Sequence, residues 1–136
     1  MALLFVFGRV AFDISLGPSI PALGLTIAAI TFSASAFGFL AATIARSRDA
    51  MLPIGTMAVV AMAAIGGCWW PITIEPTWLQ NLAHLFPTAW AMGAFNDLML
   101  RQRDLGSVLP KIGALLGFGV AYLVLGARLY ESRRTA

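Results

Sequence analysis

Charged residues are scarce in this 136-residue chain: Asp, Glu, Lys and Arg make up 11% of it, against about 25% in soluble domains. No charged residue occurs in residues 14–45 or in residues 50–74. A helix that crosses about 30 Å of hydrocarbon needs about 20 mostly apolar residues, and both stretches are longer than that. Because 60% of the residues are hydrophobic, the composition excludes a water-soluble globular protein and predicts a protein of the lipid bilayer.

Residues that usually carry catalysis or bind metals are also scarce. Cys68 is the single cysteine and His84 the single histidine, so the chain has no internal disulfide, no cysteine metal cluster and no sign of a hydrolase triad. The single lysine, Lys111, follows Pro110, which excludes the GxxxxGK[ST] loop of ATP-binding proteins. We therefore expect no catalytic residue, no metal site and no cofactor. An intramembrane enzyme is disfavoured because the apolar runs contain no paired catalytic groups.

The apolar runs predict an all-α membrane protein, a helical bundle that forms a single transmembrane domain over residues 1–136. About three full spans are expected, at about 21–45, 51–69 and 109–127, and Lys111 and Arg128 can snorkel from the ends of the last one. Residues 1–12 are apolar but too short to span. They are expected to be the end of a partial N-terminal span whose beginning is missing, or a short helix that dips into the membrane.

The segment from Gly66 to Arg103 lies between the second and third spans and belongs to neither. Trp69 and Trp70 are expected to end the second span at a membrane interface, where amphipathic aromatic rings prefer to lie. Prolines at positions 71 and 87 then break the chain into short helices. Backbone near lipid must be hydrogen-bonded, so this segment is predicted to turn twice beside the membrane, as two short helices, before it re-enters.

Two further predictions concern the end of this segment. Asp97 and Arg101 are four residues apart, a spacing that favours a solvated ion pair on one helix face. LGSVLP, residues 105–110, is expected to be a turn that leads back into the membrane.

Small residues recur at helical spacing in two spans. Ala34, Gly38 and Ala42 form one such row, and Gly113 and Gly117 form a GxxxG pattern. Such rows allow two helix backbones to approach closely. An ordinary Ala-rich membrane helix remains the alternative interpretation of the first row.

Basic residues indicate the orientation. Arg46 and Arg48 lie in the loop after the first span, and three arginines lie near the C-terminus. Two spans separate these groups, so they share a side, which the positive-inside rule identifies as the cytoplasm. The net charge of +3 needs no nucleic-acid partner, because basic and aromatic residues do not interleave.

Residues 20–130 together resemble the C-terminal half of an ABC-2 type transporter permease, the membrane subunit of an ABC exporter. The likeness consists of GGCWWP at 66–71, P-T-W-L-Q at 76–80, Pro87 with its nearby aromatic residue, and D-L-M-L-R at 97–101, followed by a Gly-rich last span. The resemblance implies a six-span permease, of which this chain would hold the last three spans and the end of the third. Residues 71–105 would be extracytoplasmic, re-entrant helices. The N-terminal half of the family pattern is absent from this chain.

The resemblance also implies a function and partners. The chain would form part of the translocation path for a hydrophobic or lipid-like substrate such as a drug, in the cell (inner) membrane as a multi-pass protein. It would pair with a second permease subunit, as a homodimer or heterodimer, and with a separate ATP-binding ABC subunit that hydrolyses ATP, so this chain itself would not be an enzyme. The alternative is a small membrane scaffold or regulatory protein without a transport path of its own.

Two groups of residues are candidates for functional sites in that interpretation. The external gate is predicted to comprise Gly66, Gly67, Trp69, Trp70, Pro71 and Pro87, because these residues lie between two spans. The loop that docks the ATP-binding subunit is predicted to comprise Arg46, Arg48 and Asp49.

Overall fold

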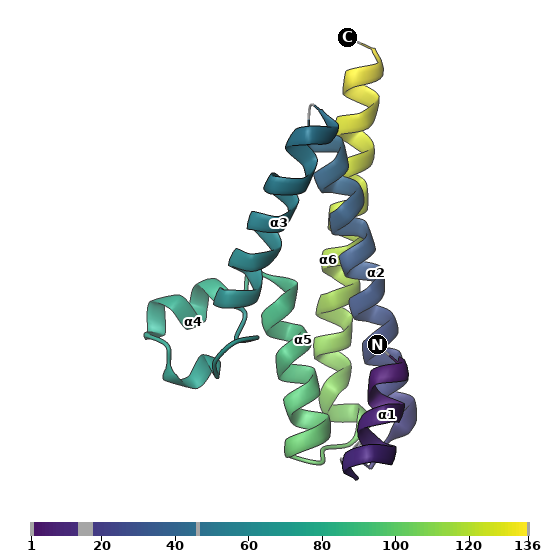
Figure 1. Ribbon diagram of the computed structural model, residues 1–136, viewed down its shortest axis with the longest axis vertical. Helices are drawn as coiled ribbons and strands as arrows, with labels where there is room; N and C mark the ends of the chain where they lie inside the picture. Colours follow the sequence, from purple (N-terminus) through teal and green to yellow (C-terminus); the bar gives the residue numbers. More distant parts are fainter. Residues whose placement is uncertain (1, 14–17, 46, 136) are drawn as a thin grey trace.

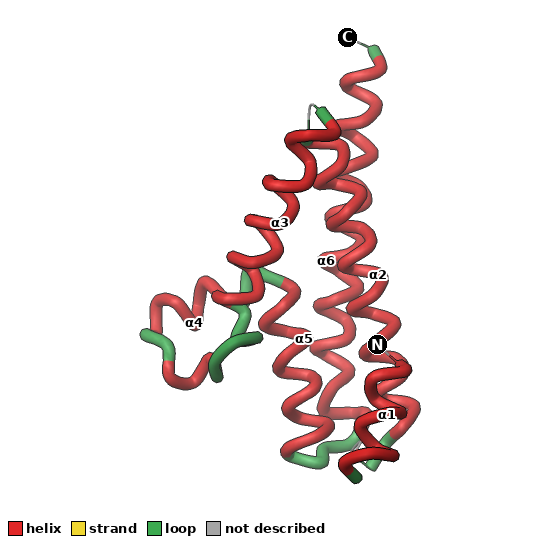
Figure 2. Tube along the Cα trace, in the orientation of Figure 1, coloured by secondary structure: helices red, strands yellow, loops and turns green. Residues whose placement is uncertain are grey.

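The computed structural model describes residues 2–13, 18–45 and 47–135 (Figure 1), and every regular element in these ranges is helical, which confirms the all-α class. Figure 2 shows how short the connecting loops are. In chain order the elements are α1 (Ala2–Phe12), α2 (Ile20–Ile44), α3 (Arg48–Ile65), η1 (Ile72–Ile74), α4 (Thr77–Ala83), α5 (Pro87–Phe95), the π-helical turn η2 (Asn96–Leu100) and α6 (Leu105–Arg134).

The two long helices α2 and α6 lie side by side and run in the same direction (Figure 1). They have 25 and 30 residues and are the two described helices that are both long and apolar enough to cross a membrane. Helices α1 and α5 lie beside their lower ends in this view, and α3 leans away from them. Two of the three expected spans are therefore helices of the length and composition that a membrane span requires.

Two glycines of α6 set the contact with α2. A Cβ atom on Gly119 would lie 2.5 Å from the Phe32 ring, and one on Gly126 would lie 2.7 Å from the Phe39 ring. Both contacts repeat after seven residues on each helix, which is the spacing of helices that cross at a shallow angle. The glycines of the predicted rows contact no other described helix, because a Cβ added at Gly38, Gly113 or Gly117 would have no neighbour within 4 Å.

Helix α3 is shorter than predicted. Ser47 caps its first turn by accepting a hydrogen bond from the Ala50 N–H at 3.2 Å, and the helix ends at Ile65 rather than at Trp69. Gly67 adopts a left-handed φ of 77°, which turns the backbone out of the helix. An 18-residue helix is about 27 Å long, so the third full span remains a prediction.

The segment after α3 divides at Pro87, as predicted. Helix α4 ends at Ala83, and α5 begins at Pro87, whose missing N–H costs nothing in a first turn. The predicted turn at residues 105–110 was wrong, because α6 already begins at Leu105 and includes Pro110. The same helix continues to Arg134.

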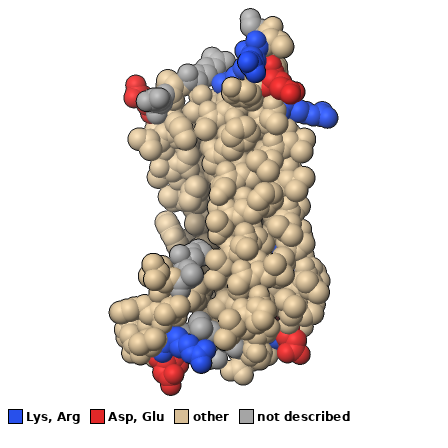
Figure 3. Space-filling view, turned by 90° about the vertical axis from the view of Figure 1, so that its right-hand side faces the viewer, with Lys and Arg blue, Asp and Glu red and all other residues tan. Residues whose placement is uncertain are grey.

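The core lies where α5, α6 and the first half of α2 meet. Its buried side chains are Ala22, Leu23, Ala29, Ala94, Leu98, Val108, Ile112 and Leu115. Helix α1 joins this end through Phe5, whose ring centroid lies 5.7 Å from that of Phe95. Charged side chains gather at the two ends of the visible face and leave a broad uncharged belt between them (Figure 3), as expected of a protein surrounded by lipid.

Candidate functional site between α3, α5 and α6

The end of α3 and the start of α5 are joined by one hydrogen bond. The Thr88 hydroxyl donates to the Met62 carbonyl at 2.7 Å, across a separation of 26 residues. Gly66 makes this approach feasible, because a Cβ there would lie 2.5 Å from the Thr88 Cβ. Of the predicted gate residues, Gly66 and Pro87 therefore lie at one junction.

The other predicted gate residues lie in the loop that follows. A Cβ on Gly67 would lie 2.5 Å from the Ile72 side chain, so this glycine is required both by space and by its φ. The Trp70 indole N–H donates to the Glu75 carboxylate at 2.6 Å. Trp69 stacks edge-to-face on Trp70 and is itself 63% exposed. The two tryptophans form part of a loop rather than the end of a span.

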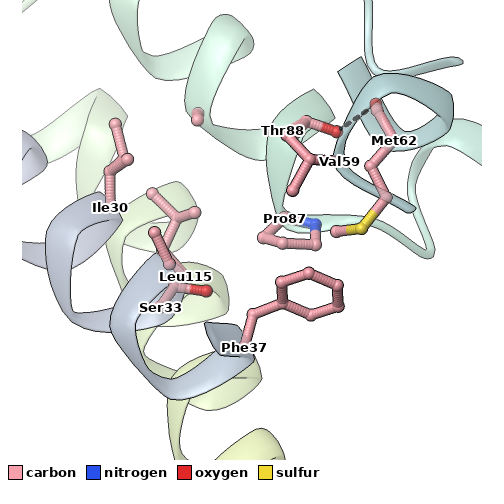
Figure 4. Close-up of a pocket in the computed structure, with 10 residues that line it drawn as sticks. Ile30, Ser33, Phe37, Val59, Met62, Pro87, Thr88 and Leu115 are labelled. Carbon is pink, nitrogen blue, oxygen red and sulfur yellow. Dashed lines mark hydrogen bonds between the residues drawn. The ribbon is translucent and has the colours of Figure 1, made fainter. Parts of the chain in front are cut away.

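An apolar cavity of about 170 Å³ lies next to this junction, roughly halfway along α2 and α6. Figure 4 shows side chains from four helices converging on it, with the Thr88–Met62 hydrogen bond at one side. The lining residues are Ile30, Ser33, Ala34 and Phe37 of α2, Val59 and Met62 of α3, Pro87, Thr88 and Ala91 of α5, and Leu115 of α6. This cavity was not predicted from the sequence, because its walls come from four separate elements.

A charged cluster lies at the other end of α5. The Asp97 carboxylate accepts hydrogen bonds from Arg101 at 3.0 Å and from Lys111, and the Lys111 ammonium also donates to the Gly93 carbonyl at 3.0 Å. The predicted pair of Asp97 and Arg101 is confirmed, but the Asp97 side chain is 3% exposed, so this carboxylate is buried rather than solvated. The missed partner, Lys111, comes from α6, fourteen residues further along the chain.

The cluster has a defined electrostatic balance. Burial raises the pKa of Asp97, but hydrogen bonds and charge from Lys111 and then Arg101 outweigh it and hold this pKa below its ordinary value. Asp97 is therefore ionised beside two cations. The cluster lines one side of a second cavity of about 420 Å³, which the loop at Gly67 and Pro71 borders on the other side.

The predicted docking loop lies at the opposite end of the molecule. Arg46 and the side chain of Arg48 lie outside the described part of the structure. Asp49 is exposed in the first turn of α3. Beside this loop the Arg133 guanidinium donates to the Ile44 carbonyl at 3.1 Å and ties the end of α6 to the end of α2, a contact that was not predicted from the sequence.

Among the described residues, no group of three or more His, Cys, Asp or Glu side chains is placed to hold a metal ion. His84 lies at the protein surface, where its Nδ1 is 2.7 Å from the Gln80 carbonyl oxygen. The arrangement thus offers an apolar cavity, a glycine- and proline-shaped junction and a buried charge cluster.

These features define a helical membrane protein with a broken helix segment packed against two long spans. Residues 1–128 match the family described as ABC-2 family transporter protein, so the chain belongs to this family and the predicted resemblance is confirmed. It is 29% identical over 91 residues to the linearmycin resistance permease protein LnrN of Bacillus subtilis (strain 168), a match that covers 67% of this chain and 24% of the relative. It is 27% identical over 113 residues to the inner membrane transport permease YadH of Escherichia coli (strain K12), a match that covers 83% of this chain and 43% of the relative.

The chain spans less than half the length of these curated relatives. No solved structure gives a significant match to it.

Proposed function

We propose that this chain is a permease subunit, or part of one, of an ATP-driven exporter, and that it forms part of the path for a hydrophobic or lipid-like substrate. The family match to residues 1–128 carries the proposal. The apolar cavity bounded by α2, α3, α5 and α6 supports the substrate class, because its walls are almost entirely apolar side chains. The relative named for linearmycin resistance fits the export of a harmful compound.

The proposal needs an external energy source. The chain has no phosphate-binding GxxxxGK[ST] loop, and the apolar cavity has no acidic or basic side chain among its lining residues, whereas ion-coupled transporters bury such groups along their path. An ATP-binding ABC subunit would therefore drive transport. A second permease subunit would complete the path, and the complex would lie in the inner membrane as a multi-pass assembly.

We assign docking of the ATP-binding subunit to the end of the molecule that holds Arg46, Arg48 and Asp49. Arg133 and Arg134 belong to the same end, since Arg133 is bonded to the last residue of α2. A cavity of about 490 Å³ opens there, with Tyr130 and the two arginines in its lining. A cationic surface of this kind favours an acidic patch on the partner.

We assign the external gate to Gly66, Gly67, Trp69, Trp70, Pro71 and Pro87. The support is their position between α3 and α5. Pro87 lines the apolar cavity and Gly66 packs against Thr88 in the same wall, whereas Gly67 and Pro71 line the second cavity. A small rotation of α5 about Pro87 would alter the apolar cavity, because Pro87, Thr88 and Ala91 form one of its walls.

The first test is co-purification of the tagged chain, from membranes in mild detergent, with the ABC ATPase encoded nearest to it. Stable recovery of the ATPase would support the permease function, and charge reversal at Arg46 and Arg48 should then lower the recovered amount. Charge reversal at Arg103, near the opposite end of α6, is the matched control. A well-folded chain that never recovers the ATPase, even when residues from an upstream reading frame are added, would favour a membrane scaffold instead.

A further inference from the structure

The apolar cavity contains one polar group without a partner. Ser33 is 2% exposed, and its hydroxyl makes no hydrogen bond within the described part of the chain. In Figure 4 this hydroxyl points into the space between Phe37, Leu115 and Pro87. A buried hydroxyl without a partner costs about 1–3 kcal/mol, and such a group in a folded protein calls for an explanation.

The three threonines of α2 form a hydrogen bond that Ser33 does not form. Thr26, Thr31 and Thr43 each donate to the carbonyl four residues earlier, at 2.8 to 2.9 Å. That back-bond is the usual way for a helix to satisfy a hydroxyl in an apolar environment. The Ser33 hydroxyl is turned away from its own helix and toward the cavity.

The cavity continues into a groove between α2 and α3. Ala34, Phe37 and Val59 line both spaces, and the groove of about 410 Å³ extends along α3 to Met51 and Leu52 near the loop end. The inner cavity has a volume of about 170 Å³. It is too small for a helix, which is about 10 Å across, but it admits several carbon atoms of an extended chain.

We propose that the cavity and groove bind the apolar chain of a lipid-like molecule, and that the Ser33 hydroxyl donates a hydrogen bond to an oxygen atom carried on that chain. This inference rests on the proposed function and gives its substrate a position and a chemical class. The apolar walls supply affinity through burial, whereas the single hydroxyl distinguishes an oxygenated chain from a plain hydrocarbon.

The test uses the full chain in phosphatidylcholine nanodiscs and two photoactivatable fatty acids. Both probes carry a mid-chain diazirine, and one also carries a hydroxyl group on the adjacent carbon. After illumination, peptide mass spectrometry gives the labelled residues, and competition gives the relative affinity of the two probes. The variants are Ala34→Phe, which fills the space shared by cavity and groove, and Ser33→Ala, which removes the hydroxyl.

Matched controls come from the same helix. Ala28 and Ser35 are exposed on α2 and do not line the cavity or the groove, so Ala28→Phe and Ser35→Ala change the lipid-facing surface alone. We expect labels on residues that line the cavity and groove. Ala34→Phe should abolish them and Ala28→Phe should leave them.

For the hydroxyl, we expect Ser33→Ala to weaken binding of the hydroxylated probe about five-fold, the equivalent of one net hydrogen bond. Ser33→Ala should leave binding of the plain probe unchanged. Ser35→Ala should not reproduce the effect of Ser33→Ala. Labels spread evenly over the lipid-facing surface, or labels that persist in Ala34→Phe, would overturn the binding site. Equal effects of Ser33→Ala on both probes would overturn the role of the hydroxyl.

This measurement needs neither ATP nor the ATP-binding subunit. Failure of the binding site while the ATPase still co-purifies would leave the proposed function standing. Specific labelling without any ATPase partner would instead indicate a lipid-binding membrane protein that is not an exporter subunit.

Discussion

Both salt bridges among the described residues end on the carboxylate of Asp97. Its two partners differ in exposure, since the Arg101 side chain is 61% exposed and the Lys111 side chain 25%. An exposed partner competes with water and contributes little, whereas a partly buried one leaves a costly charge behind when it is removed. Lys111 also bonds to the Gly93 carbonyl, so it joins α6 to both α5 and η2.

Replacing Lys111 by Met should lower the free energy of unfolding by about 2 kcal/mol, because it removes the inner partner of a buried carboxylate. The measurement is thermal unfolding of the purified chain in detergent. Arg101→Gln is the control, and its expected cost is below about 1 kcal/mol. Equal losses in the two variants would contradict the assignment of Lys111 as the main partner.

The charge cluster around Asp97 also predicts how the stability of the chain depends on pH. The pKa of Asp97 is lowered in the folded chain, so its stabilisation is complete above the ordinary value of about 3.9 and is lost as the pH falls through the lowered value. The stability difference between the wild type and Asp97→Asn should therefore stay constant from about pH 8 to pH 5. A difference that already shrinks near neutral pH would argue against an ionised Asp97.

At the scale of elements, the contact between α2 and α6 depends on where glycine occurs on α6. Gly119 and Gly126 face the aromatic rings of α2, whereas Gly113 and Gly117 face open space. The same residue type thus has opposite roles on two faces of one helix.

Gly119→Ala should lower stability by about 1 kcal/mol, because its methyl group would press on the Phe32 ring and lie 3.3 Å from the Ser33 Cα. Gly117→Ala should raise stability by up to about 1 kcal/mol, since alanine is the better helix former and nothing opposes the added methyl group. Thermal unfolding of both variants in the same detergent measures whether each substitution raises or lowers the stability. Destabilisation by Gly117→Ala would reveal a contact outside the described chain.

The junction of α3 and α5 gives a second prediction at this scale. Gly66→Ala should displace Thr88, break its bond to the Met62 carbonyl and cost about 1–3 kcal/mol. Gly55→Ala, within α3 and with open space around it, is the matched control. If the junction acts as the proposed gate, Gly66→Ala, Gly67→Ala and Pro87→Ala should also impair ATP-driven export from cells, and unchanged export would remove that assignment.

At the scale of the whole molecule, charge marks two ends and an apolar belt separates them (Figure 3). Because α2 and α6 run in the same direction, the loop before α3 and the C-terminus lie at one end, and the turn from η2 to α6 lies at the other (Figure 1). This arrangement agrees with the orientation inferred from the basic residues.

Cysteine labelling of intact cells tests that orientation. In a Cys68→Ser background, Asp104→Cys should react with a membrane-impermeant maleimide from outside, and Ser132→Cys should react only after the cells are opened. Both positions are exposed at opposite ends of α6. Labelling of both positions from outside would refute the proposed topology. Labelling of Ser132→Cys alone from outside would reverse it.

The helical class, the membrane location and the break between two short helices at Pro87 follow from the amino-acid sequence alone. Long uncharged apolar runs have few alternatives to helices in lipid, and a proline has no N–H with which to continue a helix. The motifs between residues 66 and 101 were enough to indicate the family, and the bounds of α2 were predicted to within a residue or so.

Which residues meet depends on how the helices pack in three dimensions. Asp97 pairs with Lys111 because α5 and α6 pack together, Gly119 rather than Gly117 faces α2, and Ser33 points into a cavity built by four helices. Each of these contacts joins residues far apart in the chain, and local spacing carries no information on the rotation of one helix against another. The start of α6 was missed for a related reason, because Pro110 and Gly106 resemble a turn in isolation while packing on α5 keeps this stretch helical.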